Sequence, residues 1–495
     1  MVFGGHCEVR KLSNIKKTKI VCTLGPSSST LPVIKELIKA GMNVARINMS
    51  HGTPAEHRSR IELVRAAARE LETVVGILID IQGPKLRTGV LPEKVLLEDN
   101  SLVYLASEHK SQPSIAGDYP LIRVDYQYLV EDSKVGNTIY LHDGLIKLCV
   151  EKVAEDSLLC RVLEGGELDS KKGLSLPGVS VRLPALTEKD LQDLKFAVEI
   201  GADFVALSFT RRASHIEEVR RALQNYGREI MIIAKIENEE GYDRREAILS
   251  VADGLMVARG DLGTELPLED VPIIQRTLIR AANRHGKPVI TATEMLESMI
   301  RNSRPTRAEA TDVAHAILDG TDAVMLSGET AVGRYPVQAV EVMSRVARRI
   351  EATLEYEGYN SPQKKKARAN GHEKSLTVGD AVSHGTCQIA TDLRAQAIIT
   401  ATQSGSTARM VSKNRPNTPV LATTPSPEVA RELSIIWGVI PMVVSGAKTT
   451  DETLDQSIQA SLANGYVKKG DLLVITAGVR TGIPGTTNLL QVQEV

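Results

Sequence analysis

The stretch that decides the fold is residues 231–263, MIIAKIENEEGYDRREAILSVADGLMVARGDLG. Two short apolar runs, MIIAKI and GLMVA, each end in charged residues, and apolar residues recur at helical spacing between them. This pattern predicts two parallel strands joined by a helix and covered on both faces. Because parallel neighbours point their carboxyl ends the same way, we expect Lys235, Glu237 and Asp261 to converge on one rim. A cation and two carboxylates gathered there are typical of a phosphate-and-metal site rather than of a packed core.

The composition is ordinary for a soluble globular protein. The chain has 495 residues, of which 42% are hydrophobic and 24% charged, and its formal net charge is −1. This length predicts about two to four domains, and the charge gives no reason to expect a nucleic-acid or membrane partner. No apolar run approaches membrane-spanning length, and the five cysteines form no CxxC pair. A cytoplasmic setting is the simplest prediction, while an organellar address in the N-terminal tail stays open.

Strand-like apolar runs alternate with helical segments along most of the chain. Eight such strands up to residue 328 predict an α/β fold of the (β/α)8 TIM-barrel type. Between residues 90 and 182 short alternating runs such as LVYLAS take over, which predicts a small inserted all-β domain. Beyond the barrel, the runs AIITA, PVLATT and DLLVITAG predict a three-layer α/β domain. The predicted boundaries are a tail at 1–16, the barrel at 17–88 and 184–355, an inserted β-barrel lid domain at 89–183, a linker at 356–374 and a C-terminal regulatory domain at 375–495.

Side chains mark two helix starts and the linker. Thr187 is a predicted N-cap with Asp190 in the first turn, and Thr306 and Glu309 have the spacing of a capping box. The run SPQKKKARANGHEK carries three consecutive lysines. A solvated connection is favoured there over a site for an acidic partner.

Polar residues stand at the ends of the predicted barrel strands, where the chemistry of such barrels is found. Taken singly, each has an ordinary alternative: Arg46 could bridge to a carboxylate, and Ser208 could cap a helix. For so many polar residues at successive strand ends, that alternative becomes poor. The set comprises Arg46, Asn48, Ser50, Asp80, Lys85, Arg87, Ser208, Lys235, Glu237, Asp261, Thr293, Ser327 and Glu329.

These residues lie in long, ordered motifs that extend over nearly the whole chain. The motifs include TKIVCTLGPSS, ARINMSHG, GPKLRTG, SKKGLSLPG, AKIENEEG, ARGDLG, ATEMLESM, RPTRAEATDVA and LSGETAVGRYP. In them the sequence closely resembles pyruvate kinase. The resemblance implies transfer of the phosphoryl group of phosphoenolpyruvate to ADP, giving pyruvate and ATP in glycolysis. It also implies a Mg²⁺ (or Mn²⁺) cofactor, allosteric control and a homotetramer.

The resemblance implies roles for single residues. Glu237 and Asp261 are the hard oxygen ligands that Mg²⁺ needs. Lys235 and Arg46 would stabilise the transferring phosphoryl group from two sides. The acid that protonates the enolate would be either Thr293 or an ordered water. The implied substrate contacts are Arg46, Ser208, Lys235, Gly260, Asp261 and Thr293, and the implied nucleotide contacts are His51 and Arg87 on the barrel side and Lys172 on the closing lid.

One departure from the commonest family pattern concerns potassium. Members that need K⁺ usually read Asp-Thr-Lys-Gly-Pro-Glu after the third strand, whereas residues 80–85 here read Asp-Ile-Gln-Gly-Pro-Lys. The ammonium of Lys85 carries the same charge as the ion and is predicted to lie in or near its oxygen-lined pocket, where two cations would repel. A surface lysine without a role is the alternative. We predict activity without K⁺. The pocket oxygens would come from Asn48, Ser50, Asp80 and the carbonyl of Ile81.

A second site is predicted in the C-terminal domain. The segment TQSGST follows the strand AIITA and opens a helix, so its hydroxyls and free N–H groups suit a phosphate. Ordinary N-capping explains the local sequence nearly as well, but the family places an allosteric sugar-phosphate pocket here. Ser406 and Val479 replace an Arg and a Trp of fructose-bisphosphate-responsive members, so we predict a sugar or nucleotide monophosphate as effector. The segment is Thr402, Gln403, Ser404, Gly405, Ser406 and Thr407.

Two other classes of protein share some of these features. A metal-dependent aldolase or lyase on a barrel would carry the Glu/Asp metal pair, but not SKKGLSLPG on a lid or the RPTRAE segment. A catalytically dead binding protein would be expected to lose Lys235, Glu237 or Asp261, and all three are present. Both classes are therefore disfavoured.

Overall fold

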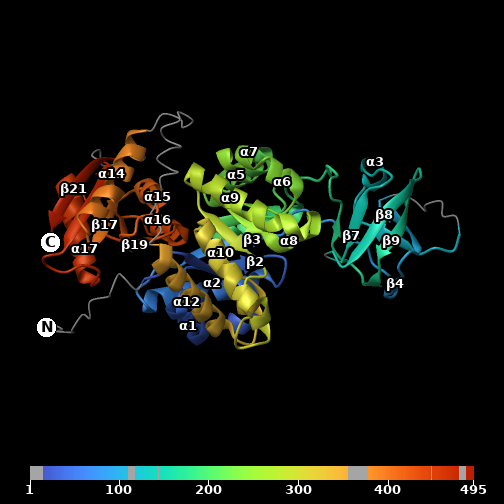
Figure 1. The fold of residues 1–495 in the computed structure, drawn as a ribbon, viewed down its shortest axis with the longest axis horizontal. Coiled ribbons are helices and arrows are strands. Elements are labelled where there is room, and N and C mark those ends of the chain that lie inside the picture. The colour runs from blue at the N-terminus through green and yellow to red at the C-terminus, as the bar shows by residue number, and fades with distance from the viewer. Residues whose placement is uncertain (1–14, 110–116, 143, 355–376, 448, 479–486) are drawn as a thin grey trace.

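The structure is a computed structural model that describes residues 15–109, 117–142, 144–354, 377–447, 449–478 and 487–495. The predicted tail at 1–16, except for residues 15 and 16, lies outside the described residues, as do the predicted linker at 356–374 and Val479. The barrel lies between the inserted domain at one end and the C-terminal domain at the other (Figure 1). No helix in the described ranges is long and apolar enough to cross a membrane.

Eight parallel strands close into a barrel, so the predicted TIM-barrel fold is confirmed. The strands are buried along almost their whole length, because the interior covers one face and the ring of helices covers the other. The strands β3 and β12 are neighbours in the barrel although the inserted domain separates them in the sequence. The barrel strands are β1 Lys19–Thr23, β2 Val44–Asn48, β3 Gly76–Ile81, β12 Phe204–Leu207, β13 Met231–Ile236, β14 Gly254–Ala258, β15 Val289–Ala292 and β16 Ala323–Leu326.

The helices of the barrel begin where their side chains predict. The Thr187 side chain accepts the Asp190 N–H, and the Thr306 side chain accepts the Glu309 N–H, which confirms both caps. The segment between β13 and β14, predicted as one helix, forms two short helices because the backbone at Arg244 leaves the helical conformation. The helices are α1 Leu31–Ala40, α2 Pro54–Glu70, α4 Glu188–Glu199, α5 Ala213–Asn225, α6 Glu239–Asp243, α7 Arg245–Val251, α8 Arg259–Glu265, α9 Val271–His285, α10 Arg307–Asp319, α11 Gly328–Ala331 and α12 Pro336–Leu354, with 3-10 turns η2 Pro26–Ser28, η3 Leu268–Asp270 and η4 Glu297–Ile300.

The chain between β3 and β12 folds into an all-β domain with its own apolar core. Its main sheet has six strands in the order β11-β7-β8-β9-β5-β6, and β10 pairs with β4 beside it. In the described part of the chain, isolated bridges of Arg87 with Gly173 and of Thr88 with Val124 link the two edges of this sheet. Single bridges thus take the place of a full closing strand. The elements are β4 Val95–Leu97, β5 Leu102–Ser107, β6 Leu121–Val124, α3 Leu129–Asp132, β7 Thr138–Leu141, β8 Ile146–Val153, β9 Leu158–Glu164, β10 Gly166–Leu168 and β11 Leu174–Ser175.

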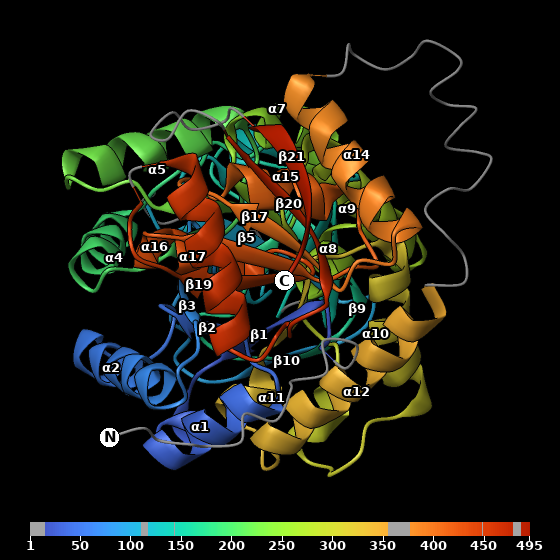
Figure 2. The ribbon, with the colours of Figure 1, turned by 90° about the vertical axis from the view of Figure 1, so that its left-hand side faces the viewer.

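The C-terminal domain is a sheet between two layers of helices, as predicted. Its five strands have the order β19-β18-β17-β20-β21, and β21 runs antiparallel to β20. One face packs against α14 and α15, and the other packs against α17, which lies in front of the sheet in Figure 2. The elements are α14 Val378–Asp392, β17 Ala397–Ala401, α15 Ser406–Lys413, β18 Val420–Thr424, α16 Pro427–Glu432, η5 Leu433–Ile435, β19 Val439–Val443, α17 Thr450–Ala463, β20 Leu472–Gly478 and β21 Thr487–Glu494.

The C-terminal domain closes the amino-terminal end of the barrel. Phe204 of the barrel interior belongs to the same apolar cluster as Leu433 and Ile435 of η5. An ion pair adds to this contact, because Arg431 Nε lies 2.7 Å from Asp203 Oδ1. The opposite, carboxyl end of the barrel faces the inserted domain, and there the predicted site residues lie.

Candidate active site

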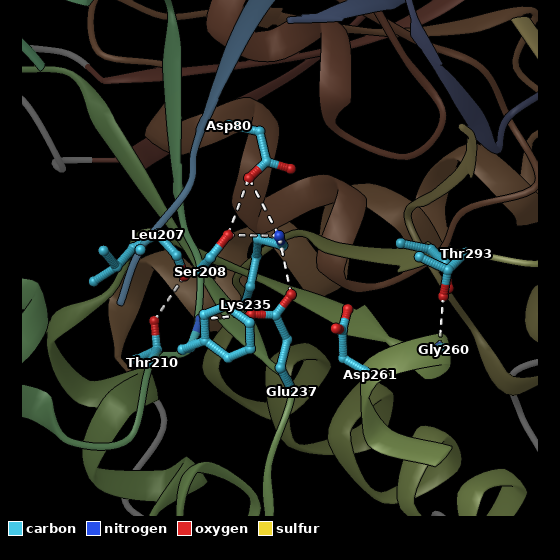
Figure 3. A network of polar contacts seen from close by, with 12 residues as sticks. Asp80, Leu207, Ser208, Thr210, Lys235, Glu237, Gly260, Asp261 and Thr293 are labelled. Atoms are coloured by element: carbon cyan, nitrogen blue, oxygen red, sulfur yellow. Dashed lines mark hydrogen bonds and ion pairs between the residues drawn. The ribbon is translucent and has the colours of Figure 1, made fainter. Parts of the chain in front are cut away.

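Lys235 is at the centre of a network of buried polar side chains at the carboxyl end of the barrel (Figure 3). It is the next-to-last residue of β13, and 8% of its surface is exposed. Its ammonium lies 3.2 Å from Asp80 Oδ1, 3.0 Å from Glu237 Oε1 and 2.7 Å from the Ser208 hydroxyl. The partners come from β3 and from the ends of β13 and β12, so the parallel register of the strands brings them together.

Opposite charges keep Lys235 protonated although it is buried. Burial alone lowers the pKa of Lys235, but Asp80 and Glu237 outweigh burial and raise that pKa above its ordinary value. Burial would also raise the pKa of Asp80, yet Lys235 and Arg46 hold it below its usual range. Arg46 Nε donates to Asp80 Oδ2 over 2.7 Å, so one carboxylate bridges two cations. Such fixed positive charge suits a phosphoryl group.

The backbone of Phe209 holds Glu237 in place. Phe209 follows Ser208 after β12 with φ 52°, and its N–H donates to Glu237 Oε2 over 2.5 Å. Burial raises the pKa of Glu237 to about 7, with the charge of Lys235 opposing this rise and that of Asp261 adding to it. A metal ion beside this carboxylate would favour its ionised form.

Glu237 and Asp261 line the same cleft, and Figure 3 shows the two carboxylates beside each other. Asp261 lies in the first turn of α8, directly after β14, and its side chain is 33% exposed. Over the described residues, no group of three or more His, Cys, Asp and Glu side chains could hold a metal. Two carboxylates completed by substrate and water oxygens are, however, the arrangement that suits Mg²⁺.

The backbone around Thr293 adopts a conformation that is rare for threonine. Thr293 follows β15 with φ 67°, and Glu294 has φ 56°. The Thr293 hydroxyl accepts the Gly260 N–H over 2.8 Å and donates to the Ala292 carbonyl over 2.7 Å. Backbone strain of this kind is concentrated at functional sites. Here it places Thr293 against the segment that carries Asp261.

Three of the four groups predicted to hold a potassium ion, Asn48, Asp80 and Ile81, accept from the protein's own donors. The Asp80 carboxylate already bridges two cations. The Ile81 carbonyl accepts the Ser208 hydroxyl over 2.8 Å, and the Asn48 side-chain oxygen accepts the Ser50 N–H over 3.1 Å. Positive charge supplied by the chain therefore already neutralises the carboxylate of this pocket.

Lys85 lines the cleft on the side of the two carboxylates. Its ammonium lies 3.8 Å from Asp261 Oδ1, and its side chain is 27% exposed. This ion pair with Asp261 could not be predicted from the residue pattern. The charge of Lys85 is thus next to a predicted metal ligand.

The residues predicted to bind the nucleotide lie in two segments. His51 is exposed in the loop before α2. Arg87 Nη1 donates to the carbonyl of Lys171 over 3.2 Å, and the Lys172 N–H donates to the Thr88 hydroxyl over 2.9 Å. Arg87 is therefore joined to the segment that carries Lys172, and not to the barrel alone.

A cleft of about 280 Å³ lies between the rim and the inserted domain. Glu237 and Asp261 line it from the barrel, and Ser180 lines it from the inserted domain. At one side the Ser175 hydroxyl donates to Glu265 Oε1 over 2.5 Å, which ties β11 to the end of α8. A substrate bound to the two carboxylates would lie between the two domains.

The predicted effector segment forms the turn into α15. Gly405 is the N-cap with φ 75°, and among the described residues no side-chain hydrogen bond caps the helix. The capping alternative therefore does not account for the hydroxyls. The Ser404 hydroxyl donates to the Ser406 hydroxyl over 3.3 Å, and Arg409 Nη2 donates to the Ser404 carbonyl over 2.6 Å. The Thr407 and Thr487 hydroxyls are 2.9 Å apart.

The sequence does not identify two residues of the rim. Phe209 contributes a backbone N–H, which an apolar residue type does not signal. Arg259 is a charged residue at the end of β14 and could have been found by the rule that identified Asp261. Conversely, Glu329 stands at a strand end, but its carboxylate accepts the backbone N–H groups of Leu296 and Ser327, over 2.9 and 2.8 Å. That role is structural.

The fold and the site define an enzyme on a (β/α)8 barrel, with lysine and carboxylates at the carboxyl rim and an all-β domain inserted after the third strand. Comparison with known proteins gives the family. Residues 15–340 match the family model described as "Pyruvate kinase, barrel domain", and residues 380–493 match "Pyruvate kinase, alpha/beta domain". The chain belongs to the pyruvate kinase family.

Individual relatives are similar over nearly the whole chain. The pyruvate kinase of Clostridium acetobutylicum is 47% identical over 483 residues, which cover 97% of this chain and 100% of that protein. The pyruvate kinases of Staphylococcus aureus (strain MRSA252) and Sporosarcina psychrophila are 48% and 47% identical over 486 and 485 residues. These matches cover 97% of this chain and 81% of each relative. The predicted enzyme class is thereby confirmed.

Proposed function

We propose that this chain transfers the phosphoryl group of phosphoenolpyruvate to ADP in a Mg²⁺-dependent step of glycolysis, giving pyruvate and ATP. The observation that carries this proposal is the buried Lys235 between Asp80 and Glu237, beside the cleft that Glu237 and Asp261 line. A phosphoryl group in transfer carries its charge on its equatorial oxygens, so catalysis consists mainly of positioning and charge stabilisation. The rim offers fixed charge of the required sign.

The positively charged residues bind the phosphoryl group, and the carboxylates bind the metal ion. Lys235 and Arg46 both contact the Asp80 carboxylate, which places their positive charges close together. In this proposal both hold the phosphoryl group, with Arg46 on the side of β2. Glu237 and Asp261 hold Mg²⁺ or Mn²⁺. When bound, such an ion neutralises negative charge on the substrate oxygens as the enolate leaves.

Neutral groups place the rest of the substrate. The Ser208 hydroxyl, already 2.7 Å from the Lys235 ammonium, contacts the phosphate. The N–H groups of Gly260 and Asp261, at the start of α8, bind the carboxylate of the substrate, and the Gly260 N–H is shared between that carboxylate and the Thr293 hydroxyl. Thr293, bonded to Gly260, contacts the substrate from the other side, and either its hydroxyl or a water that it orders delivers the proton to the enolate.

The inserted domain acts as a lid over this site. His51 contacts the nucleotide from the barrel, and Arg87 and Lys172 reach its phosphates together from the segment that joins the lid. Closure excludes water from the cleft, which prevents hydrolysis of the phosphoryl group before it reaches ADP.

Potassium is not required in this proposal. The Asp80 carboxylate is neutralised by Arg46 and Lys235, and Lys85 adds a further cation at the rim, 3.8 Å from Asp261. A free monovalent cation in the pocket of Asn48, Ser50, Asp80 and Ile81 would meet charge of its own sign.

Regulation and assembly follow the family. Residues 402–407 bind the phosphate of a sugar or nucleotide monophosphate effector, at a turn where no side chain in the described part of the chain caps the helix. The enzyme is a cytoplasmic homotetramer to which the C-terminal domain contributes contacts.

A coupled assay tests the proposal. Purified protein is given phosphoenolpyruvate, with and without ADP and with and without Mg²⁺, while pyruvate and ATP are measured separately. We expect equal amounts of both products, and neither product when ADP or Mg²⁺ is omitted. Pyruvate release without ADP would indicate a hydrolase or lyase instead.

A further inference from the structure

The turn that carries Thr293 cannot be held by its own residues. Thr293 and Glu294 follow each other in the left-handed region, with φ 67° and 56°, and a β-branched residue is unfavourable there. Such a conformation persists only where surrounding groups fix it. Contacts from another segment must therefore stabilise the turn.

Arg259 supplies those contacts. Its Nε donates to the Ala292 carbonyl over 3.3 Å and its Nη2 to the Thr293 carbonyl over 2.7 Å, so one guanidinium holds two successive carbonyls. Nη2 also lies 2.9 Å from Met295 Sδ. The planar fork of arginine fixes the orientation of both peptide groups, which a lysine could not do.

Side chains of two barrel helices hold the Arg259 guanidinium in place. Its Nη1 lies 2.6 Å from Asp312 Oδ1 on α10 and 3.3 Å from Gln275 Oε1 on α9. The Arg259 side chain is 10% exposed and that of Asp312 is 35% exposed, so the guanidinium itself is largely buried and cannot swing freely. Two helices outside the site thus set where the arginine stands.

We propose that Arg259 is a positioning residue for the reaction, acting through Thr293. The arginine holds the strained turn so that the Thr293 hydroxyl meets the Gly260 N–H at 2.8 Å and remains at the substrate. This inference rests on the proposed role of Thr293. Without the fork, the turn relaxes toward ordinary backbone and the hydroxyl moves away from the enolate carbon.

The experiment compares Arg259→Gln, Thr293→Ala and the double variant with the parent enzyme. The readouts are kcat, KM for phosphoenolpyruvate and ADP, and the exchange of pyruvate methyl protons into D₂O with ATP and Mg²⁺ present. Exchange reports proton transfer at the substrate carbon. We expect Arg259→Gln to lower kcat and exchange about 100-fold, as a displacement of about 1 Å can do, with KM for ADP nearly unchanged. The double variant should be no slower than the slower single variant, because both changes remove one function.

Arg220→Gln is the matched control. Arg220 Nη2 donates to the Val251 carbonyl and to Asp253 Oδ2, both over 2.9 Å, at the amino end of the strand whose carboxyl end carries Arg259. We expect this variant to keep its exchange rate and kcat. Arg259→Lys keeps the charge beside Asp312 but not the fork, and should lose about tenfold in kcat; it serves as the test if Arg259→Gln does not fold.

Each contrary outcome overturns a defined statement. If the losses in kcat multiply in the double variant, the inference about Arg259 is wrong. It is also wrong if the folded Arg259 variants have normal kcat while Thr293→Ala is slow. Neither result would affect the proposed role of Thr293. Normal turnover and exchange in Thr293→Ala would overturn the proposed role of Thr293 and the inference with it. In that case phosphoryl transfer from phosphoenolpyruvate to ADP would still stand.

Discussion

The two ends of the barrel bury lysines in opposite ways. At the carboxyl rim, Lys235 lies between two carboxylates, which raise its pKa above its ordinary value although burial lowers it. At the amino-terminal base, Lys16 Nζ donates to the Thr18 carbonyl and the Asn43 side chain, and Lys19 Nζ donates to the Val439 carbonyl. Burial there lowers the pKa of Lys16 to about 7 and that of Lys19 to about 8.

The difference shows how one fold separates chemistry from stability. The rim keeps a charged lysine under burial because Asp80 and Glu237 stand beside it, and that charge is available for a phosphoryl group. The base joins two domains through apolar packing and through the ion pair of Asp203 with Arg431, and Arg65 of the barrel shares the same carboxylate. Substitutions at the rim should therefore change turnover, and substitutions at the base should change stability.

The largest effect is expected at Lys235. Lys235→Met removes the charge that stabilises the transferring phosphoryl group, so kcat should fall by roughly 10³-fold or more with little change in KM. Circular dichroism should show a folded protein, because Asp80 keeps Arg46 as a partner. Steady-state kinetics measure the effect, and near-normal turnover would remove Lys235 from the mechanism.

The corresponding change at the base is Asp203→Ala. It leaves Arg65 and Arg431 without their shared carboxylate and should lower the free energy of unfolding by about 3 kcal/mol. Folded protein should keep kcat within about twofold, since the site lies at the other end of the barrel. Denaturant unfolding and kinetics on the same sample check both statements. A variant of normal stability and low kcat would contradict the separation.

A smaller effect within the rim concerns potassium. The parent enzyme should be active in K⁺-free buffer with tetramethylammonium as counter-ion, and Lys85→Glu should restore stimulation by K⁺ of roughly tenfold. The variant removes the internal cation and rebuilds the glutamate of K⁺-dependent members. If K⁺ raises the activity of the parent enzyme a hundredfold, Lys85 does not replace the ion.

The smallest effect is expected at Lys16. Its folded pKa of about 7 lies below the value of 10.5 for an exposed lysine, so the unfolded chain binds more protons between these limits. The contribution of Lys16 to stability should thus rise with pH through this window. Lys16→Met should flatten that rise, because methionine binds no proton in either state. Thermal denaturation of both proteins from pH 7 to pH 10 measures the difference, and parallel curves would mean that Lys16 stays charged at the base.

The barrel and the position of the rim residues could be predicted from the sequence, because buried parallel strands form clear apolar runs. Apolar runs that alternate with helices indicated the barrel, and the rule that parallel strands end at one rim placed Lys235 with Glu237, which the structure brings to 3.0 Å. Arg259 stands at a strand end and could have been listed with the rim residues, but its role and that of Phe209 could not be predicted from residue type. Both roles depend on positive φ angles and on contacts between segments distant in the sequence.

The contact between the barrel and the C-terminal domain at the amino-terminal base could not be predicted from the sequence either. Nothing in the pattern around Leu433 and Ile435 indicates that they continue the core of the barrel, because an apolar residue does not specify its partner. Similarly, Lys85 was recognised as a departure from the family pattern, but its ion pair with Asp261 depends on how the chain turns after β3.

The assignment of the metal to Glu237 and Asp261 is the claim on which the rest of the site depends. Titration of the purified enzyme with Mn²⁺, followed by electron paramagnetic resonance, tests it directly in the parent, Glu237→Gln and Glu329→Gln. Because burial raises the pKa of the Glu237 carboxyl, a pH of 8 is used to favour its ionised form. Glu329 is an equally buried rim carboxylate that backbone N–H groups occupy, which makes it the matched control. We predict that Glu237→Gln weakens Mn²⁺ binding at least roughly tenfold, while Glu329→Gln binds like the parent. Unchanged affinity in Glu237→Gln would contradict the account.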